Sequence, residues 1–229
     1  MGYLIEHLEC SINRIEILKN RQFMKLKIAC TLLLLLASCQ PSTTSKIPYQ
    51  YLNSRDNSLP PLYRAKVPDH WMAIPVSDNY IDTTKPIAQW EIKENDQTIL
   101  VTVHNFPGEE QKKVPLLSQV DRWKHQFSSL EEDCVDIQRQ AFSGFYGYSI
   151  CAQGVCKGID QCTLGWALRL GQNHTHNLLY SVNYPTYLQL TADVTIKAVG
   201  PKNLVHNYKS EIEQFAKSFE LIDPIQQDL

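Results

Sequence analysis

The chain has 229 residues, of which 43% are hydrophobic and 20% are charged, and its formal net charge is −2. This composition is typical of a globular protein and is sufficient for one well-packed domain with a tail. Because the sequence contains no basic tract, it lacks the electrostatic footprint of a nucleic-acid-binding protein. It also contains no internal repeat or heptad pattern that would indicate a solenoid or a coiled coil.

The first segment with a clear signature is the apolar run from Ile28 to Ala37. At about ten residues, it has half the length that a membrane-spanning helix needs. Two lysines precede the run, and small residues followed by Cys39 end it, which is the pattern of a secretory signal peptide over residues 24–38. The alternative is a buried core helix, but the run Leu32–Leu36 is apolar on every side and lacks the polar face of such a helix.

The end of this signal, Leu-Ala-Ser-Cys at 36–39, resembles the bacterial lipobox. The resemblance implies that Cys39 receives a diacylglyceryl thioether, that the preceding peptide is removed, and that the new amino terminus is open to acylation. Two or three acyl chains hold a protein on a membrane essentially permanently, whereas a single chain is marginal. By the sorting convention of Gram-negative lipoproteins, Gln40 implies the outer membrane rather than the inner one.

The regions next to the signal are assigned from their composition. Residues 1–23 are interpreted as an over-called amino-terminal extension, because Met24 is well placed as the start of a signal peptide. Residues 39–61, rich in Pro, Ser, Thr and Asn, predict the lipidated cysteine and a flexible tether with a mean span of about 25 Å. The globular domain is predicted over residues 62–223, followed by a short tail at 224–229.

The first half of the predicted domain contains a strand entry, a hairpin and a helix. The strand entry is expected over 65–75, with Trp71 as its anchor. Residues 87–93 and 98–104 alternate in polarity on either side of Asn95-Asp96, which predicts a β-hairpin. A helix is expected from about Pro115. Its expected apolar stripe consists of Leu116, Leu117, Val120, Trp123 and Phe127.

The second half predicts further strands and a closing helix. The expected strands span 134–140, 145–152, 163–171, 188–200 and 219–222, and the first two are joined by a turn near Ser143-Gly144. Pro201 is expected to open the helix. Its expected apolar stripe consists of Leu204, Val205, Tyr208, Ile212 and Phe215. Because strands outnumber helices and most connections are hairpins, the predicted fold class is α+β, a mainly antiparallel β-sheet with helices packed on it.

Several stretches of this domain resemble one set of bacterial exported proteins. The stretches are VPDHW at 67–71, VTVHNFPGE at 101–109, VDRWKHQF at 120–127, VTIKAVGP at 194–201 and FAKSFEL at 215–221. The set is similar to PsbP, the extrinsic subunit of the photosynthetic oxygen-evolving complex, and has a PsbP-like α/β/α sandwich. The resemblance implies a non-enzymatic assembly factor or binding module. No functional residue of PsbP itself maps onto these positions.

Four cysteines of the predicted domain are candidates for disulfides, as expected of an exported protein. Three connectivities are open. The hairpin positions favour Cys134–Cys151, which lie symmetrically about a point next to the expected turn, and Cys156–Cys162, which flank the loop at 157–161. A shifted register would break the first pair, since disulfides need Cα atoms about 5.5–6 Å apart. The alternatives are free buried thiols and, less favoured, a zinc site, for which no CxxC motif or nearby histidine completes a ligand set.

The sequence carries no signature of a catalytic, cofactor-binding or metal-binding site. The motifs of nucleophile elbows, zinc proteases, P-loops and dinucleotide-binding turns do not occur. His174 and His176 are two residues apart but lack a third ligand, so a polar loop is the simpler interpretation. Arg122 and Asp121 flank the predicted apolar stripe and are placed to border a groove, whereas Trp123 on the stripe is more simply a core residue.

Three roles are open at this stage. The favoured role is a lipid-anchored, non-catalytic binding or assembly module of the cell envelope, with an unidentified envelope protein as partner. Its acylated terminus also resembles the ligands of host innate lipoprotein receptors, which implies such a receptor as a further partner if the organism infects animals. The second role is an envelope hydrolase whose site forms only in the fold, and the third is a spacer. Candidate bases for the hydrolase are His104, His174, His176 and His206.

Overall fold

The computed structural model describes residues 47–52, 61–76, 84–106, 114–171 and 193–222. The chain divides into two compact units, residues 1–46 and residues 47–229, and every described residue belongs to the second unit. The predicted extension, the signal peptide, Cys39, most of the tether, His174, His176 and the tail therefore lie outside the described residues. No helix within the described ranges is long and apolar enough to cross a membrane.

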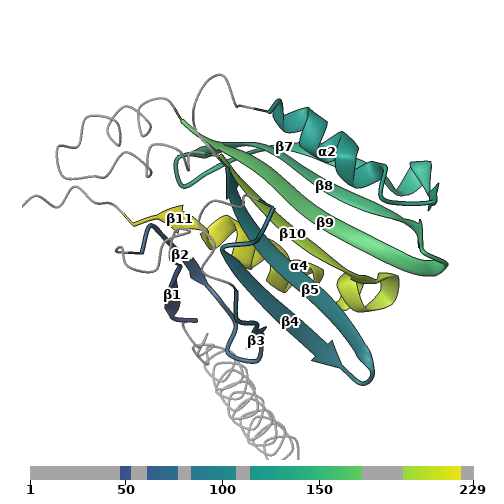
Figure 1. The fold of residues 1–229 in the computed structure, drawn as a ribbon, viewed down its shortest axis with the longest axis horizontal. Coiled ribbons are helices and arrows are strands. Elements are labelled where there is room, and N and C mark those ends of the chain that lie inside the picture. Colours follow the sequence, from purple (N-terminus) through teal and green to yellow (C-terminus); the bar gives the residue numbers. More distant parts are fainter. Residues whose placement is uncertain (1–46, 53–60, 77–83, 107–113, 172–192, 223–229) are drawn as a thin grey trace, which may run out of the picture. The chain divides into compact units, whose positions relative to one another are not determined.

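The described elements are mostly strands. They are β1 (Tyr49–Leu52), β2 (Tyr63–Lys66), β3 (Met72–Ala73), β4 (Ala88–Glu94), β5 (Gln97–Phe106), β6 (Ser129–Leu130), β7 (Asp136–Phe142), β8 (Phe145–Cys156), β9 (Ile159–Leu170), β10 (Asp193–Pro201) and β11 (Glu220–Leu221). The helices are α2 (Leu116–Lys124), the short 3-10 helix η2 (Glu132–Cys134) and α4 (Lys202–Ser218). Figure 1 shows how these elements are arranged.

All strand pairings among the described residues are antiparallel, and they form two sheets. The larger sheet has eight strands in the order β3-β4-β5-β10-β9-β8-β6, with β7 also pairing with β8. The smaller sheet has the order β1-β2-β11. Two helices pack on the larger sheet, so the predicted α+β fold with a mainly antiparallel sheet is confirmed.

The predicted hairpin turns are confirmed at two places. β4 and β5 pair with Glu94 opposite Gln97, and Asn95 in the turn adopts a φ of 53°, a left-handed conformation that asparagine tolerates better than most residues. β7 and β8 are joined by the turn at Ser143-Gly144. A further two-residue turn at Lys157-Gly158 joins β8 to β9, where the sequence instead predicts a five-residue loop.

Helix α4 and the main core occupy one face of the larger sheet. Successive side chains of a strand point to opposite faces, and α4 packs over β9, β10 and β5 (Figure 1). The buried residues of α4 are Leu204, Val205, Ile212, Phe215 and Ala216. Of the predicted stripe, only Tyr208 is no more than partly buried. The expected anchor Trp71 is 5% exposed, and its ring lies 5.0 Å from that of Phe215.

Helix α2 covers the opposite face with a smaller core. It packs over β8 and β9, and the buried residues of this second core are Val120, Trp123, Ile150, Ala152 and Ala167. A Cβ atom on Gly165 would lie 2.4 Å from the Trp123 ring, so the absence of a side chain at Gly165 lets the indole rest directly on β9. Leu117 is 47% exposed, and its predicted place in the stripe is wrong because this narrow contact reaches only one side of the helix.

The prediction of a flexible tether over 39–61 is wrong for residues 49–52, which form β1. This strand pairs with β2 from Tyr49 opposite Lys66 to Leu52 opposite Tyr63. Leu52 is buried in the main core. The Tyr49 ring lies under the guanidinium carbon of Arg64 at 4.8 Å and under the ammonium nitrogen of Lys66 at 5.2 Å. A segment with the composition of a linker therefore contains a short strand. One buried leucine and the cation–π contacts of Tyr49 hold this strand on β2.

The first predicted disulfide, Cys134–Cys151, is absent, and both residues are free thiols. The β7–β8 register places Asp136 opposite Cys151, so the hairpin is centred one residue later in the chain than the symmetric arrangement requires. Cys134 also lies in η2, outside the strand. The shift moves Cys134 two positions away from the partner that the sequence predicts for it.

The second predicted disulfide, Cys156–Cys162, is also absent. The turn between β8 and β9 is tight, so Cys156 lies opposite Ile159 while Cys162 lies opposite Gln153. Gln153 and Cys156 are three positions apart on β8, so their side chains point to opposite faces of the sheet. Cys156 and Cys162 consequently point away from each other.

Candidate functional site

A groove runs beside α2, on the face of the sheet that this helix covers only in part. Because α2 has nine residues and packs on β8 and β9, no described helix covers the neighbouring strands β10 and β5 next to it. Two pockets of about 360 and 460 Å³ lie here and share four lining residues, which are Phe106, Gln119, Arg122 and Thr195. We call the two together the α2 groove, and each is within the size range of small-molecule sites.

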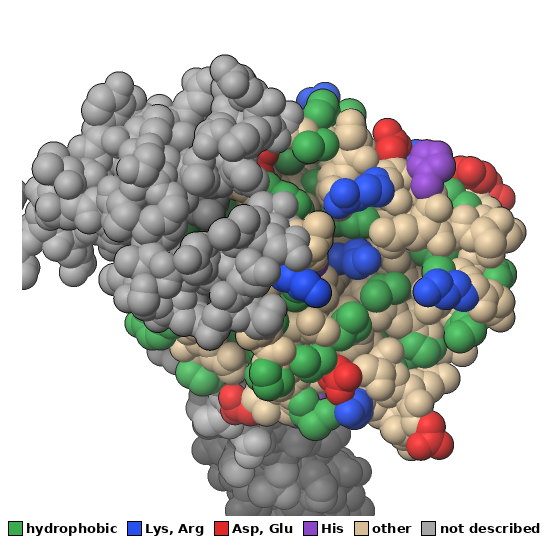
Figure 2. Space-filling model, viewed as in Figure 1, with side chains coloured by type: hydrophobic (Ala, Val, Ile, Leu, Met, Phe, Trp, Pro, Cys, Tyr) green, Lys and Arg blue, Asp and Glu red, His purple; other side chains and the backbone are tan. Residues whose placement is uncertain are grey.

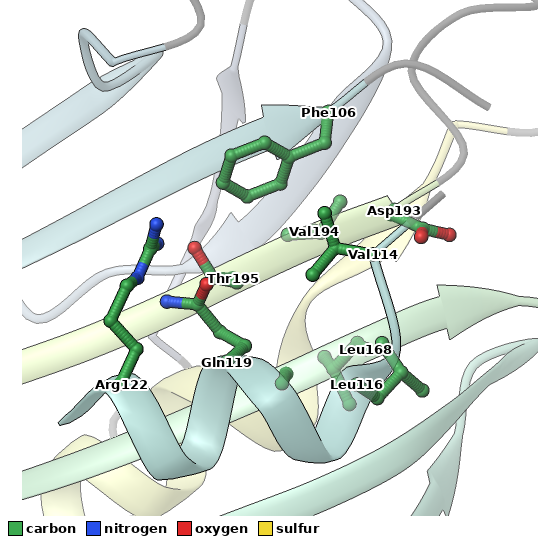
Figure 3. Close-up of a pocket in the computed structure, with 10 residues that line it drawn as sticks. Phe106, Val114, Leu116, Gln119, Arg122, Leu168, Asp193, Val194 and Thr195 are labelled. Carbon is green, nitrogen blue, oxygen red and sulfur yellow. The ribbon is translucent and has the colours of Figure 1, made fainter. Parts of the chain in front are cut away.

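One end of the α2 groove is apolar. Its apolar side chains come from the end of β5, the segment entering α2 and β9, and they are Phe106, Val114, Leu116 and Ala167. Leu168 and Val194 also border this end, but their side chains belong to the main core on the other face of the sheet. Figure 3 shows the Phe106 ring on the side of the cavity opposite α2, with Arg122 and Gln119 projecting from the helix toward the strands. This end offers a surface for an apolar group of a ligand.

A buried ion pair closes the apolar end. Arg169 on β9 donates three hydrogen bonds to Asp193 on β10. They run from Nε to Oδ1 at 3.0 Å and to Oδ2 at 3.2 Å, and from Nη2 to Oδ2 at 2.7 Å. The same Nη2 donates to the carbonyl oxygen of Val114 at 3.1 Å. Since Arg169 neutralises Asp193 and also holds the chain that enters α2, the pair fixes the helix relative to the sheet.

The other end of the α2 groove is polar and carries positive charge. Its side chains are Thr84, Thr102, His104, Gln126, Arg122 and Lys197. Lys197 on β10 donates to Oε1 of Gln126 at 3.4 Å. Across the described ranges, no carboxylate lies within ion-pair distance of Arg122 or Lys197. Figure 2 shows Lys and Arg side chains near the centre of the face viewed.

Burial and the neighbouring charge both work against the ammonium form of Lys197. Burial is the main cause that lowers the pKa of Lys197, and the positive charge of Arg122 lowers this pKa further. An anion between these two cations would offset both effects, because it supplies an opposite charge and replaces lost hydration. The polar end is therefore electrostatically suited to an anionic group.

The described residues of the groove supply charged, hydroxyl and amide groups for binding. Its described lining contains no Ser or Cys, and its carboxylate, Asp193, is already held by Arg169 at the far end. His104 lies in the groove with its ring stacked on Phe106 at 6.3 Å. His206 lies on α4, across the sheet, within 3.0 Å of the Gln153 amide. The two described candidate bases are thus not brought together.

The sequence places Arg122 at a groove beside the apolar stripe, and the structure confirms this. Asp121, predicted with it, is exposed and pairs with Lys124 at 2.9 Å instead. Sequence reasoning missed Lys197 and Phe106, because the groove combines strands that lie about ninety residues apart in the chain. One signal was present: Thr195 and Lys197 are polar alternate residues in the otherwise apolar run of β10, whose opposite face is core. The described residues contain no cluster of three metal-ligating side chains.

No protein-family model matches the sequence, and comparison with curated proteins gives no match. Three solved structures are similar in fold. The first is LpqN, involved in cell envelope biogenesis of Mycobacterium tuberculosis, with a TM-score of 0.45 and 8% identity over 77% of this chain and 92% of that one. The second is cyanobacterial PsbP (CyanoP) from Synechocystis sp. PCC 6803, with a TM-score of 0.45 and 12% identity over 80% of this chain and 97% of that one.

The third similar structure is PA94 from Pseudomonas aeruginosa, a protein of unknown function, with a TM-score of 0.38 and 9% identity over 68% of this chain and 88% of that one. All three similarities combine a TM-score below 0.5 with low sequence identity. They are similarities of the backbone fold alone, and no residue role is transferred from them. The PsbP-like assignment of the sequence stays a resemblance beside the α+β architecture that the structure shows.

Proposed function

We propose that this chain is a lipid-anchored lipoprotein of the bacterial cell envelope whose domain is a non-catalytic binding module. Its ligand is an amphiphile with an apolar body and an anionic group, bound in the α2 groove. The observation that carries this proposal is the pair Arg122 and Lys197, two cations without a described carboxylate partner at one end of a groove whose other end is apolar.

The two ends of the groove account for the two parts of the ligand. An alkyl or aromatic body that covers Phe106 and Leu116 would remove apolar surface from water, which contributes about 25 cal/mol per Å². An anionic group between Arg122 and Lys197 would make charge-assisted hydrogen bonds, which are about twice as strong as neutral ones. A fully apolar molecule would leave the polar end unsatisfied, and a fully polar molecule would leave the apolar end in contact with water. An amphiphile therefore fits the whole groove best.

The ligand class is tested with three ten-carbon probes that differ only in the head group. Binding of decanoate, decanol and decyltrimethylammonium to the purified chain is measured by calorimetry at low and at physiological salt. We expect decanoate to bind most tightly and to lose affinity as salt is added, since screening weakens its contact with the cations. Equal affinity for decanoate and decanol would overturn the assignment of an anionic group.

The site is tested with charge-removing substitutions. Arg122→Gln and Lys197→Gln should each weaken decanoate binding about tenfold, which corresponds to 1.4 kcal/mol. The matched control is Lys124→Gln, which removes the same charge from α2 but at a side chain that does not line the groove. If Lys124→Gln weakens binding as much as Arg122→Gln does, the effect comes from net charge and the groove is not the site.

The anchor is proposed to be the lipid on Cys39, with Gln40 favouring the outer membrane. Labelled palmitate should be incorporated into the chain in growing cells, and Cys39→Ala should abolish the incorporation. The mature protein should stay on membranes after a carbonate wash. A mature chain that begins upstream of Cys39, or that is released by carbonate, would overturn this part of the proposal.

Two further partners belong to the proposal. One is an envelope protein that the domain contacts in an assembly role, and cross-linking in intact cells with identification of the product tests it. The other is a host innate lipoprotein receptor, which would recognise the acylated terminus alone. Receptor stimulation by the purified lipoprotein should disappear in Cys39→Ala and should be unchanged in Arg122→Gln, because the receptor reads the lipid and not the groove.

A further inference from the structure

Two of the free thiols lie side by side beneath α4, on the face of the sheet opposite the α2 groove. In the β8–β9 ladder, Cys151 lies opposite Leu164 and Cys162 lies opposite Gln153. Cys151 and Cys162 are therefore diagonal neighbours on one face, close enough for their side chains to interact. Both contact the main core, and their thiols are hydrogen-bonded to each other.

The two sulfur atoms have different surroundings. Cys162 is fully buried, and the hydrogen bond that it donates to Cys151, together with burial, raises its own pKa. The same hydrogen bond lowers the pKa of Cys151 to about 7, although burial opposes it. The positive charge of Lys209 on α4 and the amide of Gln153 also lower this pKa, and Asp136 on β7 raises it. Cys151 is half-buried, so its thiolate is accessible enough to attack an external reagent.

We propose that Cys151 and Cys162 are a redox-active pair that closes reversibly into a disulfide between β8 and β9. The Cys151 thiolate attacks one sulfur of an external disulfide, which forms a mixed disulfide and releases the first external thiolate. Cys162 then loses its proton and attacks the Cys151 sulfur, which releases the second external thiolate. The two cysteines lose two electrons and two protons, and the external disulfide becomes two thiols.

The diagonal placement favours a reversible bond over a permanent one. Diagonal Cα atoms of a regular antiparallel pair stand about 7–8 Å apart, whereas most disulfides join Cα atoms about 4.4–6.8 Å apart. Closing the bond therefore requires β8 and β9 to approach each other locally. A disulfide under such strain is reduced more readily than a relaxed structural one.

The remaining two thiols serve as internal controls. Cys134 lies in η2, where a hydrogen bond with Glu131 and burial raise its pKa, so it reacts more slowly at neutral pH. Cys156 follows the register of Ile150 and Ala152 on the α2 face, so the sheet separates it from Cys162. The proposal thus predicts one pairing among the four described thiols.

The experiment uses the full chain, purified from membranes in detergent under reducing conditions. The protein is transferred to buffers with increasing ratios of oxidised to reduced glutathione, quenched with acid, alkylated and digested with trypsin. A bond between Cys151 and Cys162 joins the tryptic peptides 140–157 and 158–169. We expect this linked species to form and to disappear when dithiothreitol is added.

Single substitutions identify the partners and their order. Cys156→Ser and Cys134→Ser should leave the linked peptides unchanged, and Cys151→Ser should abolish them. Cys162→Ser should instead accumulate glutathione on Cys151, because the resolving thiol is missing. Alkylation of Cys151 in this variant should rise with pH and remain faster than that of Cys134 at neutral pH. The flanking charges that act on this profile are Lys209, which lowers the pKa of Cys151, and Asp136, which raises it.

Two results would overturn the proposal. One is full alkylation of all four thiols at every glutathione ratio in the unsubstituted chain, which needs no variant and is independent of folding defects. The other is a link through Cys156 or Cys134 in place of Cys151 and Cys162. Neither result bears on ligand binding in the α2 groove, since the pair lies on the opposite face, and a failure of decanoate binding would leave the redox pair untouched.

Discussion

The two faces of the larger sheet differ in how completely a helix covers them. On one face, the 17-residue helix α4 seals a large aromatic core. On the other face, the nine-residue helix α2 buries only a small cluster and leaves β10 and β5 partly open. We therefore expect most of the stability to come from the α4 face, and the proposed ligand binding falls on the α2 face because a fully packed surface has no room for a ligand.

Charge is distributed in the same way. Among the described residues, the α4 face meets its helix mainly through apolar side chains. Its polar contacts include His206 with Gln153 at 3.0 Å and Glu211 with His70 at 3.1 Å. The α2 face brings Arg169, Asp193, Arg122 and Lys197 into or beside its groove. Burying charge is costly unless it is paired, so the residual positive charge on the α2 face supports the proposed anionic ligand.

The largest effect is expected from Phe215→Ala on the α4 face. Phe215 is 1% exposed, and its ring lies 5.0 Å from that of Trp71 and 5.3 Å from that of Trp90. Its loss would leave a cavity and should lower the free energy of unfolding by about 3–5 kcal/mol, measured by urea denaturation of the purified chain. The matched control is Leu117→Ala on the exposed side of α2, which should change it by less than about 0.5 kcal/mol. Similar losses for both variants would contradict the comparison of the two faces.

A smaller effect is expected from Asp193→Asn, which breaks the charge pair of the α2 face. The Asp193 side chain is 8% exposed, and its removal as a charge leaves Arg169 without this counter-ion. Loss of hydrogen bonds to a charged group typically costs about 1.5–3 kcal/mol. Urea denaturation gives the free energy of unfolding, and we expect decanoate binding to weaken as well, since Arg169 also holds the chain at Val114. Full retention of both stability and binding would show that the pair does not organise the groove.

The next effect concerns the contact between Gly165 and Trp123. In Gly165→Ala, the new methyl group would meet the indole ring, and overpacking of this kind costs about 1–3 kcal/mol. In a Trp123→Leu background, the same substitution should cost clearly less, because the ring that it meets is gone. A double-mutant cycle by urea denaturation measures the difference. Equal costs in both backgrounds would mean that Trp123 does not rest on β9.

The sequence predicts the parts of the fold that depend on local patterns. The hairpin at Asn95-Asp96 and the helix that follows Pro201 are confirmed, since turn residues and helical periodicity are properties of neighbouring residues. The cysteine pairs are wrong because a register depends on the position of a turn to within one residue. The symmetric position of Cys134 and Cys151 around an approximate turn was insufficient for that precision.

The candidate site was predicted only in part, for a related reason. Arg122 was identified because it borders a helical stripe that can be read locally. Lys197 and Phe106 belong to strands that meet only after the sheet has formed, and the sequence contains no signal that aligns β5 with β10. The residues of β1 were similarly hidden, since four residues of a strand within a polar segment carry too little hydrophobic periodicity to be distinguished from a linker.

The smallest effect is expected from an exposed ion pair, Glu131 with Lys202, whose nitrogen and oxygen atoms lie 2.8 Å apart at the start of α4. The hydrogen bond from Lys202 lowers the pKa of Glu131 below its ordinary value of 4.5. A carboxyl group with a lowered pKa stabilises the fold above its ordinary pKa, and this contribution is lost as the pH falls through the lowered value. Glu131→Gln should therefore reduce the urea midpoint slightly at pH 7 and leave it unchanged under strongly acidic conditions.

Salt and a neighbouring substitution separate this pair from the buried one. The effect of Glu131→Gln should shrink further in high salt, because exposed charges are screened, whereas the effect of Asp193→Asn should persist. Glu132→Gln, which removes the same charge one residue away, is the matched control, and it should leave the urea midpoint at pH 7 almost unchanged. If Glu131→Gln proved as damaging as Asp193→Asn and equally insensitive to salt, the exposed pair would be a structural link between η2 and α4. The stability of the fold would then depend on the edge of the sheet as well as on its two faces.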